Sequence, residues 1–333
     1  MKAVVINSYG GVDNLSVADV AVPEVGSDDV LVKVRFCGVN RLDVWIRTGK
    51  RQCKGFPHIM GSEISGEVAG IGNNVAVFPW LFCGKCSRCL NGEENMCTGA
   101  GSGTVGRTTD GGYAEYVRVP AANIVKLPEN VSPEQAASVT LAAVTAWRML
   151  KKAGIKRNET VLVLAAASGV GIYAVQLAKI LGARVIAAAS SDEKLALARK
   201  LGADETVNYA AADLEKEVMA FTGNKGVDVV AEQVGKETWS KSINCLAVGG
   251  RIITCGATTG SEAGIDILRL FQRHISIIGS SGGTRADLRE ILGFVSRELL
   301  KPVIHSVLPL EQAAEAHTLL ESRQVMGKLL LEP

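Results

Sequence analysis

The stretch VLVLAAASGVG, residues 161–171, is an apolar run that leads directly into a turn of small residues. Residues 169–182 continue with apolar side chains at helical spacing, so the stretch predicts a buried strand, a tight turn and a helix N-terminus. A dinucleotide pyrophosphate can bind there, because small residues let the backbone approach it and the free N–H groups of the helix favour an anion. Of the glycines that a GxGxxG fingerprint would place at 166, 168 and 171, only Gly171 is kept, so an ordinary strand-to-helix turn remains the alternative. We expect cofactor contacts from Ala167, Ser168, Gly169, Val170 and Gly171.

Strand and helix patterns alternate from this turn onward. Six apolar strand candidates are separated by helical segments such as DEKLALARKLGA (192–203) and DLEKEVMAFTG (213–223). This alternation predicts βαβ crossovers and a doubly wound parallel sheet. The strand candidates are ETVLVLAAA (159–167), RVIAAAS (184–190), ETVNY (205–209), VDVVAEQV (227–234), GRIITCGA (250–257) and HISIIGSS (274–281).

The segment before residue 159 shows a different sequence pattern. Short β-rich runs bounded by Gly, Pro, Asn and Asp predict an all-β, barrel-like domain, and the last fifty residues return to short helices and a strand, GKLLLE (327–332). A length of 333 residues also exceeds what one hydrophobic core usually serves. The β-rich runs are KAVVI (2–6), DDVLVKVRF (28–36), EISGEVAGI (63–71) and GGYAEYVRVP (111–120).

Composition excludes several classes of protein. The 36 Lys and Arg against 34 Asp and Glu give a net charge of +2, which is too balanced for a nucleic-acid binder. No apolar run has the roughly 18 residues of a membrane span, and the N-terminus lacks the apolar core of a signal peptide. We therefore expect a cytoplasmic protein with no nucleic-acid or membrane partner. Eight cysteines in such a protein suggest metal or redox chemistry rather than disulfides.

Four of the eight cysteines fall within fifteen positions, as Cys83, Cys86, Cys89 and Cys97. Two-residue spacers let the backbone fold around one ion, and four thiolates complete a tetrahedral shell with no open position. The spacing predicts one structural Zn²⁺. An iron–sulfur centre and four unrelated cysteines are the alternatives.

The end of the second strand bears on which dinucleotide is bound. An NAD-binding chain would place Asp or Glu near Ala189 to accept the ribose 2′-hydroxyl, but Ser190 and Ser191 follow, with Lys194 one turn later. Hydroxyls and a cation suit a 2′-phosphate, so NADP(H) is favoured over NAD(H). The alternative is that a serine only caps the next helix and Lys194 is solvated, and Asp192 could weaken a phosphate site.

Taken together, these motifs resemble the medium-chain dehydrogenase/reductase superfamily, which includes zinc alcohol dehydrogenases and quinone oxidoreductases. The resemblance covers nearly the whole chain and implies a GroES-like catalytic domain of residues 1–140 with 284–333, including a zinc lobe at 83–97, and a Rossmann domain of residues 141–283. It also implies a homodimer or homotetramer, in which the sheets of two Rossmann domains often join. The segments that carry it are GVNRLD (38–43), GSEISG (61–66), the four-cysteine lobe, GGYAEY (111–116), VTAW (144–147) and AAASGVG (165–171).

The positions of the catalytic zinc ligands depart from this family. A zinc alcohol dehydrogenase has cysteine, histidine and cysteine where this chain has Asn40, Ser62 and Leu141. Asn and Ser are poor zinc ligands and Leu cannot ligate, so no catalytic zinc is expected. Near Asn74 the chain is also about ten residues shorter than the family usually is, through either a deletion or an omitted loop.

Without a Lewis acid, hydride delivery to a quinone or an α,β-unsaturated carbonyl is the easier chemistry, because the charge spreads over a conjugated system. Asn40 and Ser62 are the candidate hydrogen-bond donors to the substrate oxygen. The alternatives are that Asn40 is only a turn residue and that Ser62 only fills the space of the lost ligand. The resemblance implies that Thr145 contacts the nicotinamide and that Tyr209 reaches the 2′-phosphate. We expect an NADPH-dependent reductase of a small carbonyl or quinone, with an alcohol dehydrogenase/aldehyde reductase or a non-catalytic, crystallin-like NADPH-binding protein as alternatives.

Overall fold

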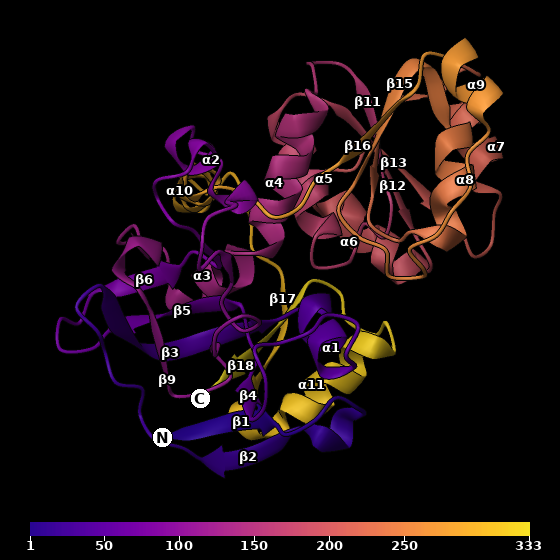
Figure 1. Cartoon of the computed structure of the whole chain (residues 1–333). Helices are drawn as coiled ribbons and strands as arrows, with labels where there is room; N and C mark the ends of the chain where they lie inside the picture. Colours follow the sequence, from indigo (N-terminus) through magenta and orange to yellow (C-terminus); the bar gives the residue numbers. More distant parts are fainter. The chain divides into compact units, whose positions relative to one another are not determined.

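The computed structural model describes all 333 residues, and the chain divides into two compact units (Figure 1). Unit 1 comprises Met1–Val144 and Gly283–Pro333, and unit 2 comprises Thr145–Gly282. Unit 1 is therefore built from both ends of the sequence, and unit 2 is inserted between them. No helix combines the length and the apolar character needed to cross a membrane.

Unit 2 contains one six-stranded sheet in the order β13-β12-β11-β14-β15-β16, and all neighbouring strands are parallel. The order reverses between β11 and β14, which is typical of doubly wound dinucleotide folds. The parallel sheet predicted from the strand–helix alternation is thereby confirmed. Its strands are β11 (Thr160–Val163), β12 (Arg184–Ala189), β13 (Glu205–Asn208), β14 (Val227–Glu232), β15 (Leu246–Thr254) and β16 (Ser276–Gly279).

Helices cover both faces of this sheet, with α5 and α6 on one face and α7 and α8 on the other (Figure 1). Strands covered on both sides carry apolar residues continuously rather than in alternation, which explains the unbroken run in β11, where Val161, Leu162 and Val163 are fully buried. The helices are α4 (Ala142–Ala153), α5 (Gly171–Ile180), α6 (Asp192–Lys200), α7 (Leu214–Phe221), α8 (Lys236–Asn244) and α9 (Ile267–Gln272).

Unit 1 contains a seven-stranded sheet in the order β10-β6-β5-β3-β18-β17, with β9 also paired to β3. A three-stranded sheet β2-β1-β4 and a small pair β7-β8 complete its β structure. The strands are β1 (Lys2–Ile6), β2 (Ser16–Asp19), β3 (Asp29–Val39), β4 (His58–Ile59), β5 (Glu63–Val68), β6 (Asn74–Val77), β7 (Trp80–Leu81), β8 (Gly103–Thr104), β9 (Tyr116–Pro120), β10 (Ile124–Lys126), β17 (Ile304–Pro309) and β18 (Lys328–Glu332).

The two chain ends meet in this sheet, where β18 runs antiparallel to β3 and pairs Leu331 with Cys37 and Leu329 with Val39. Cys37 is therefore a buried strand residue. The α-helices of the unit are α1 (Arg41–Arg47), α2 (Ser87–Leu90), α3 (Pro133–Val139), α10 (Arg285–Ser296) and α11 (Ala313–Glu321). Its 3₁₀ turns are η1 (Val12–Asn14), η2 (Glu94–Met96), η3 (Ala121–Asn123) and η4 (Leu310–Gln312).

The shortened segment before Val77 forms a closed β-hairpin. The amide of Val68 donates to the carbonyl of Asn73 at 3.2 Å, and Gly70 and Gly72 adopt φ of +78° and +75°, which only glycine takes readily. β6 then pairs with β5 on one side and β10 on the other. The sheet is thus continuous across the segment without further residues.

Candidate functional site

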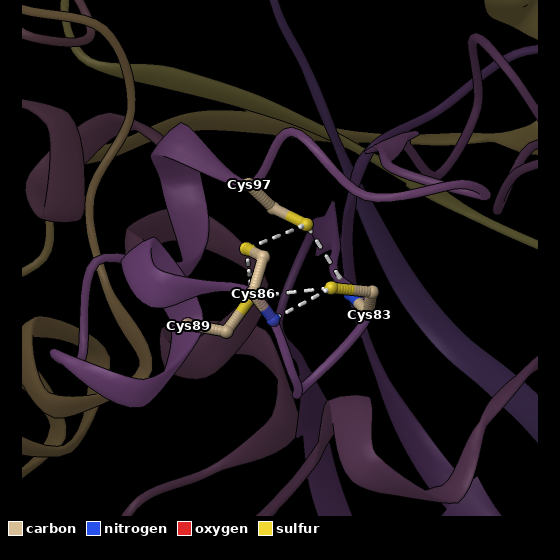
Figure 2. A group of neighbouring side chains, drawn as sticks. All are labelled: Cys83, Cys86, Cys89 and Cys97. Atoms are coloured by element: carbon tan, nitrogen blue, oxygen red, sulfur yellow. Dashed lines mark hydrogen bonds between the residues drawn. The ribbon is translucent and has the colours of Figure 1, made fainter.

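The four cysteines of the lobe at 83–97 bring their sulfur atoms together (Figure 2). The Sγ atoms lie 3.5 Å apart for Cys86 and Cys89, and 3.9 Å apart for both Cys83–Cys89 and Cys86–Cys97. A tetrahedral zinc with Zn–S bonds of about 2.3 Å requires neighbouring sulfurs about 3.8 Å apart. The four residues therefore fit one zinc ion.

Backbone amides around the cluster favour thiolates. The amide of Cys83 donates to Sγ of Cys97 at 3.3 Å, and the amide of Cys86 donates to Sγ of Cys83 at 3.3 Å. Hydrogen bonds from the amides of Cys89 and Thr98 lower the pKa of Cys86 to about 5. A metal takes up the thiolate form of cysteine, so the same amides prepare the cluster for a cation.

Arg285 at the start of α10 anchors the lobe. Its Nε lies 3.4 Å from Oε1 of Glu94, its Nη1 donates to the carbonyl of Ala122 at 2.8 Å, and its guanidinium lies 5.0 Å from the centroid of the Phe82 ring. These contacts tie the lobe to a helix from the other end of the chain, which suits a structural role.

The turn after β11 has the geometry of a tight strand-to-helix connection. Oγ of Ser168 accepts from the amide of Gly171 at 3.1 Å, and a Cβ on Gly171 would lie 2.2 Å from the carbonyl oxygen of Ala165, so glycine is required there. Ala165 itself has φ of +46°, a left-handed conformation unfavourable for alanine. Sequence reasoning singled out Gly171 but missed Ala165, where only the run of small residues hinted at strain. The turn lies at Ala167, Ser168, Gly169, Val170 and Gly171.

The end of β12 presents a mixed set of polar groups. Oγ of Ser191 accepts from the amide of Lys194 and caps α6, as the alternative interpretation held, whereas Ser190 is exposed and its Oγ accepts from Nζ of Lys194 at 3.4 Å. The carboxylate of Asp192 accepts from Nδ2 of Asn208 at 2.9 Å. No carboxylate stands at Ala189, and Asp192 points its charge at a neighbouring strand end.

Tyr209 follows β13 directly, and its amide donates to the carbonyl of Ala189 at 3.1 Å. The tyrosine is therefore on the same edge of the sheet as the serines, and its side chain is half-buried. Thr145 is buried in α4. Tyr209, Ser190 and Lys194 thus follow the carboxyl ends of the neighbouring strands β12 and β13. A site for a 2′-phosphate would need polar groups at this place.

In unit 1, Asn40, Glu63 and Lys328 form one buried cluster. Nζ of Lys328 lies 2.7 Å from Oε2 of Glu63 and donates to Oδ1 of Asn40 at 2.7 Å and to the carbonyl of Val39 at 3.1 Å. Nδ2 of Asn40 in turn donates to Oε2 of Glu63 at 2.9 Å and to the carbonyl of Gly38 at 3.1 Å. Both side chains of the ion pair are at least 98% buried, with exposures of 2% for Lys328 and 0% for Glu63. Both amide hydrogens of Asn40 are therefore engaged within the protein.

Glu63 also joins this cluster to α4. Its Oε1 accepts from the amides of Leu141 and Ala142 at 2.8 and 3.0 Å, so a negative charge lies at the N-terminus of the helix. The hydroxyl of Ser62, the residue before Glu63, is buried without a hydrogen-bond partner. Ser62 therefore retains a free donor, unlike Asn40.

Asp43 holds together the two loops that carry Asn40 and Ser62. Its Oδ2 accepts from the amide of Asn40 at 2.8 Å and its Oδ1 from the amide of Gly61 at 3.2 Å. Burial raises the pKa of the Asp43 carboxyl to about 6, although these hydrogen bonds and the charge of Lys328 act in the opposite direction. One carboxyl group thus fixes the relative position of both candidate residues.

Comparison with known proteins gives whole-chain matches. Family models described as "Alcohol dehydrogenase GroES-like domain", "Zinc-binding dehydrogenase" and "TrkA-N domain" match residues 26–129, 169–297 and 120–209. The NAD-dependent alcohol dehydrogenase of Sulfolobus acidocaldarius is 34% identical, with 100% of this chain and 99% of that protein covered.

The chain belongs to the medium-chain dehydrogenase/reductase superfamily. The quinone oxidoreductase of Pseudomonas aeruginosa is 32% identical over 100% of this chain and 99% of that protein. A crystal structure of an NAD-dependent alcohol dehydrogenase superposes with a TM-score of 0.95 at 44% identity, with both chains fully covered. The protein is therefore an oxidoreductase of this superfamily, with its GroES-like and Rossmann-like domains.

The catalytic zinc found in part of the superfamily does not fit the residues of this chain. The three ligand positions hold Asn40, Ser62 and Leu141, of which Leu141 has no donor atom. The carboxylate of Glu63 is adjacent to Ser62 in sequence, and both of its oxygens are already hydrogen-bonded, one of them to the ammonium of Lys328. The donor set and the buried cation both disfavour a metal ion at this place.

Lys328 and Asp43 were missed as members of this site by sequence reasoning. Lys328 is separated from Asn40 by 288 residues, and a lysine before an apolar strand looks like an ordinary solvated end. Asp43 lies three residues after Asn40 at the start of a helix, and such spacing is the signal of a capping box. Lys328 therefore had no local sequence signal, whereas Asp43 had the spacing of a capping box.

Proposed function

We propose that this member of the superfamily is an NADPH-dependent reductase of quinones or α,β-unsaturated carbonyls, with a structural zinc and no catalytic zinc. The observation that carries the proposal is the set of residues at the positions where relatives with a catalytic zinc have its ligands. Asn40, Ser62 and Leu141 occupy the ligand positions, and the Glu63–Lys328 ion pair is buried beside them. A substrate whose negative charge delocalises needs no Lewis acid, and hydrogen bonds can hold its oxygen.

NADPH supplies a hydride to the β-carbon of the substrate when it is bound. The electron pair of the hydride would form the new C–H bond, the electron pair of the C=C bond would shift toward the substrate's oxygen, and a proton from water would complete the reduction. We assign the hydrogen bond to that oxygen to Ser62, because its buried hydroxyl has no partner in the protein. Asn40 instead serves to hold Glu63 and Lys328, because both of its amide hydrogens are engaged.

The NADP(H) preference rests on the edge of the sheet beyond β12. An NAD-binding carboxylate would stand at Ala189, and none is present, whereas Ser190 and Lys194 lie in contact there. A cation and a hydroxyl bind a 2′-phosphate, and Asp192 is engaged by Asn208. The name of the Sulfolobus relative specifies NAD, so the ratio of kcat/KM for NADPH and NADH is the direct test.

An alcohol dehydrogenase or aldehyde reductase is the second candidate, favoured by the names of the Sulfolobus relative and of the superposed crystal structure. Two substrate panels separate the candidates: quinones and enals with NADPH, and primary and secondary alcohols with NAD⁺ and NADP⁺. Turnover of the first panel only, reduced at least tenfold by Ser62→Ala, is the expected result. Robust oxidation of simple alcohols contradicts the proposal. Tight NADPH binding without turnover on either panel would indicate a non-catalytic protein.

We also propose that unit 2 carries the contact of a homodimer, which could pair further into a tetramer. β16 is the edge strand of its sheet and bonds only to β15. Apolar side chains are exposed at this end of the unit, which favours a second protein surface over water. They are Ile277 on β16, exposed by 43%, and Ile267, Leu268 and Phe271 on α9, exposed by 69%, 55% and 61%.

A further inference from the structure

An open cavity in unit 1 lies where α1 and α11 end beside the loop that leads into η1. It has a volume of about 630 Å³, and its lining includes Gly10, Gly11, Val12, Arg47, Thr318 and Glu321. Arg47 is the last residue of α1 and Asn40 caps the start of the same helix. The cavity therefore lies one helix length, about 10 Å, from the cluster around Glu63.

Arg47 is the unusual member of this lining. Its side chain is only 2% exposed, and its Nε has no hydrogen-bond partner. One N–H group, on Nη2, donates to Oε2 of Glu321 at 2.6 Å. A buried guanidinium with an unused donor is costly, so an additional acceptor at this place would be stabilising.

The carboxylate that pairs with Arg47 is partly open to water. Glu321 is the last residue of α11, and its side chain is 36% exposed. Arginines outnumber carboxylates around it, because Arg47 pairs with it, Arg41 donates to the carbonyl of the preceding residue, Leu320, at 2.9 Å, and Arg323 follows two residues later. An external anion could therefore take the place of Glu321 while Glu321 turns toward water.

The rest of the lining restricts what such an anion can be. The hydroxyl hydrogens of Thr48, Thr318 and Ser322 donate to carbonyls of their own helices at 2.8, 2.9 and 3.1 Å. These hydroxyls have no further hydrogen to donate to a ligand, so the charged donor of the lining is Arg47. Its planar guanidinium matches the two oxygens of a carboxylate headgroup. Gly10, Gly11 and Val12 bring no polar side chain, so an apolar body fits against them.

We propose that this cavity binds a small organic carboxylate whose headgroup replaces Glu321 on Arg47 and whose apolar part lies against Gly10–Val12. The ligand chemistry is independent of the reductase function proposed above, and the site would stand if that function were wrong. Glu321 competes with the ligand for Arg47. Removal of the Glu321 charge should therefore strengthen binding of the ligand, and removal of the Arg47 charge should abolish it.

Isothermal titration of the full chain with hexanoate, at low ionic strength, tests this arrangement. We expect saturable binding of hexanoate and none of hexanamide, which has the same body without the charge. Glu321→Gln should tighten hexanoate binding about tenfold by removing the competitor, and Arg47→Met should abolish it. Glu205→Gln is the matched control, because Glu205 is also 36% exposed and pairs with Arg184 at 3.1 Å away from this cavity.

Arg47→Met removes the partner of Glu321, and an unpaired carboxylate can impair folding. The Arg47→Met/Glu321→Gln variant loses both charges together and serves as the second non-binding protein. Weaker binding in Glu321→Gln than in the wild type overturns the proposal, as does hexanoate binding that survives in the double variant. Equal binding of hexanamide contradicts the carboxylate assignment. Inorganic phosphate binding more tightly than hexanoate contradicts it as well.

Discussion

Replacement of Lys328 by methionine would remove the cation from the buried cluster of Asn40, Glu63 and Lys328. The Glu63 carboxylate would keep its bonds from the amides of Leu141 and Ala142 and from Asn40, but its charge would be uncompensated in a site with no solvent exposure. Breaking one partner of a buried ion pair costs about 3–5 kcal/mol. Because three hydrogen bonds remain, we expect the lower end, about 3 kcal/mol.

A double-mutant cycle separates the ion pair from the packing of its side chains. Glu63→Gln alone should also cost about 3 kcal/mol, because an amide would face the ammonium of Lys328 with a donor. The combined variant leaves no uncompensated charge, so its cost should fall below the sum of the two by at least about 2 kcal/mol. For a unit of this size, the loss of 3 kcal/mol in Lys328→Met corresponds to a lowering of Tm by roughly 6–12 °C.

The assay is thermal and urea unfolding of the four proteins, followed by far-UV circular dichroism. Arg35 on β3 and Glu67 on β5, the strand that also carries Glu63, give a matched control, because their N–O contact is 2.8 Å but their exposures are 50% and 28%. The Arg35→Met/Glu67→Gln cycle should yield a coupling below about 1 kcal/mol. A cost below about 1 kcal/mol for Lys328→Met, or additive costs in the Glu63/Lys328 cycle, would refute the reasoning.

Four further predictions follow from other parts of the structure. Metal analysis should find one zinc per chain, and Cys89→Ser should lower that content and the Tm together; two zinc ions per chain would contradict the interpretation of the catalytic position. Ala165→Gly should raise stability by about 1 kcal/mol by relieving the left-handed φ of +46°, measured by urea unfolding, and a loss of stability would exclude strain at this turn. The pKa of Asp43, raised from 3.8 to about 6, means that the folded state holds this proton more tightly than the unfolded state, so stability should be lost as pH rises from about 4 to 6. Asp43→Asn should flatten that part of a Tm-against-pH curve, and an unchanged slope would exclude Asp43 as its source. Ile277→Lys should convert the dimer expected from unit 2 into monomers in light scattering, and an unchanged mass would place the contact elsewhere.

The fold could be predicted in large part because its strongest signals are local. The apolar run at 161–164 and the helical spacing after Gly171 specify a strand and a helix with no knowledge of distant residues. The four cysteines are likewise close in sequence, and their spacing already implied one common centre. Local patterns of this kind are fixed by backbone geometry and coordination chemistry, which do not depend on the rest of the chain.

The inner arrangement of the candidate site could not be predicted in the same way. Asn40 was expected to donate to a substrate, yet the structure engages its amide with Glu63 and Gly38. That outcome depends on Lys328, which reaches the site only through the pairing of β18 with β3. Residue type and spacing show which polar groups a site contains. Long-range strand pairing decides which of these groups keep a hydrogen-bond donor that is free to bind a substrate.

The pairing of β18 with β3 also orders events on the ribosome. Lys328 emerges 288 residues after Asn40, and at about 5–20 residues per second this is an interval of roughly 15–60 s. Unit 2 is contiguous and can fold within that interval, while the nascent unit 1 still lacks the strand that neutralises Glu63. Completion of the buried cluster of Asn40, Glu63 and Lys328 therefore waits for translation of β18, and the incomplete unit 1 is the species that most needs protection from aggregation during synthesis.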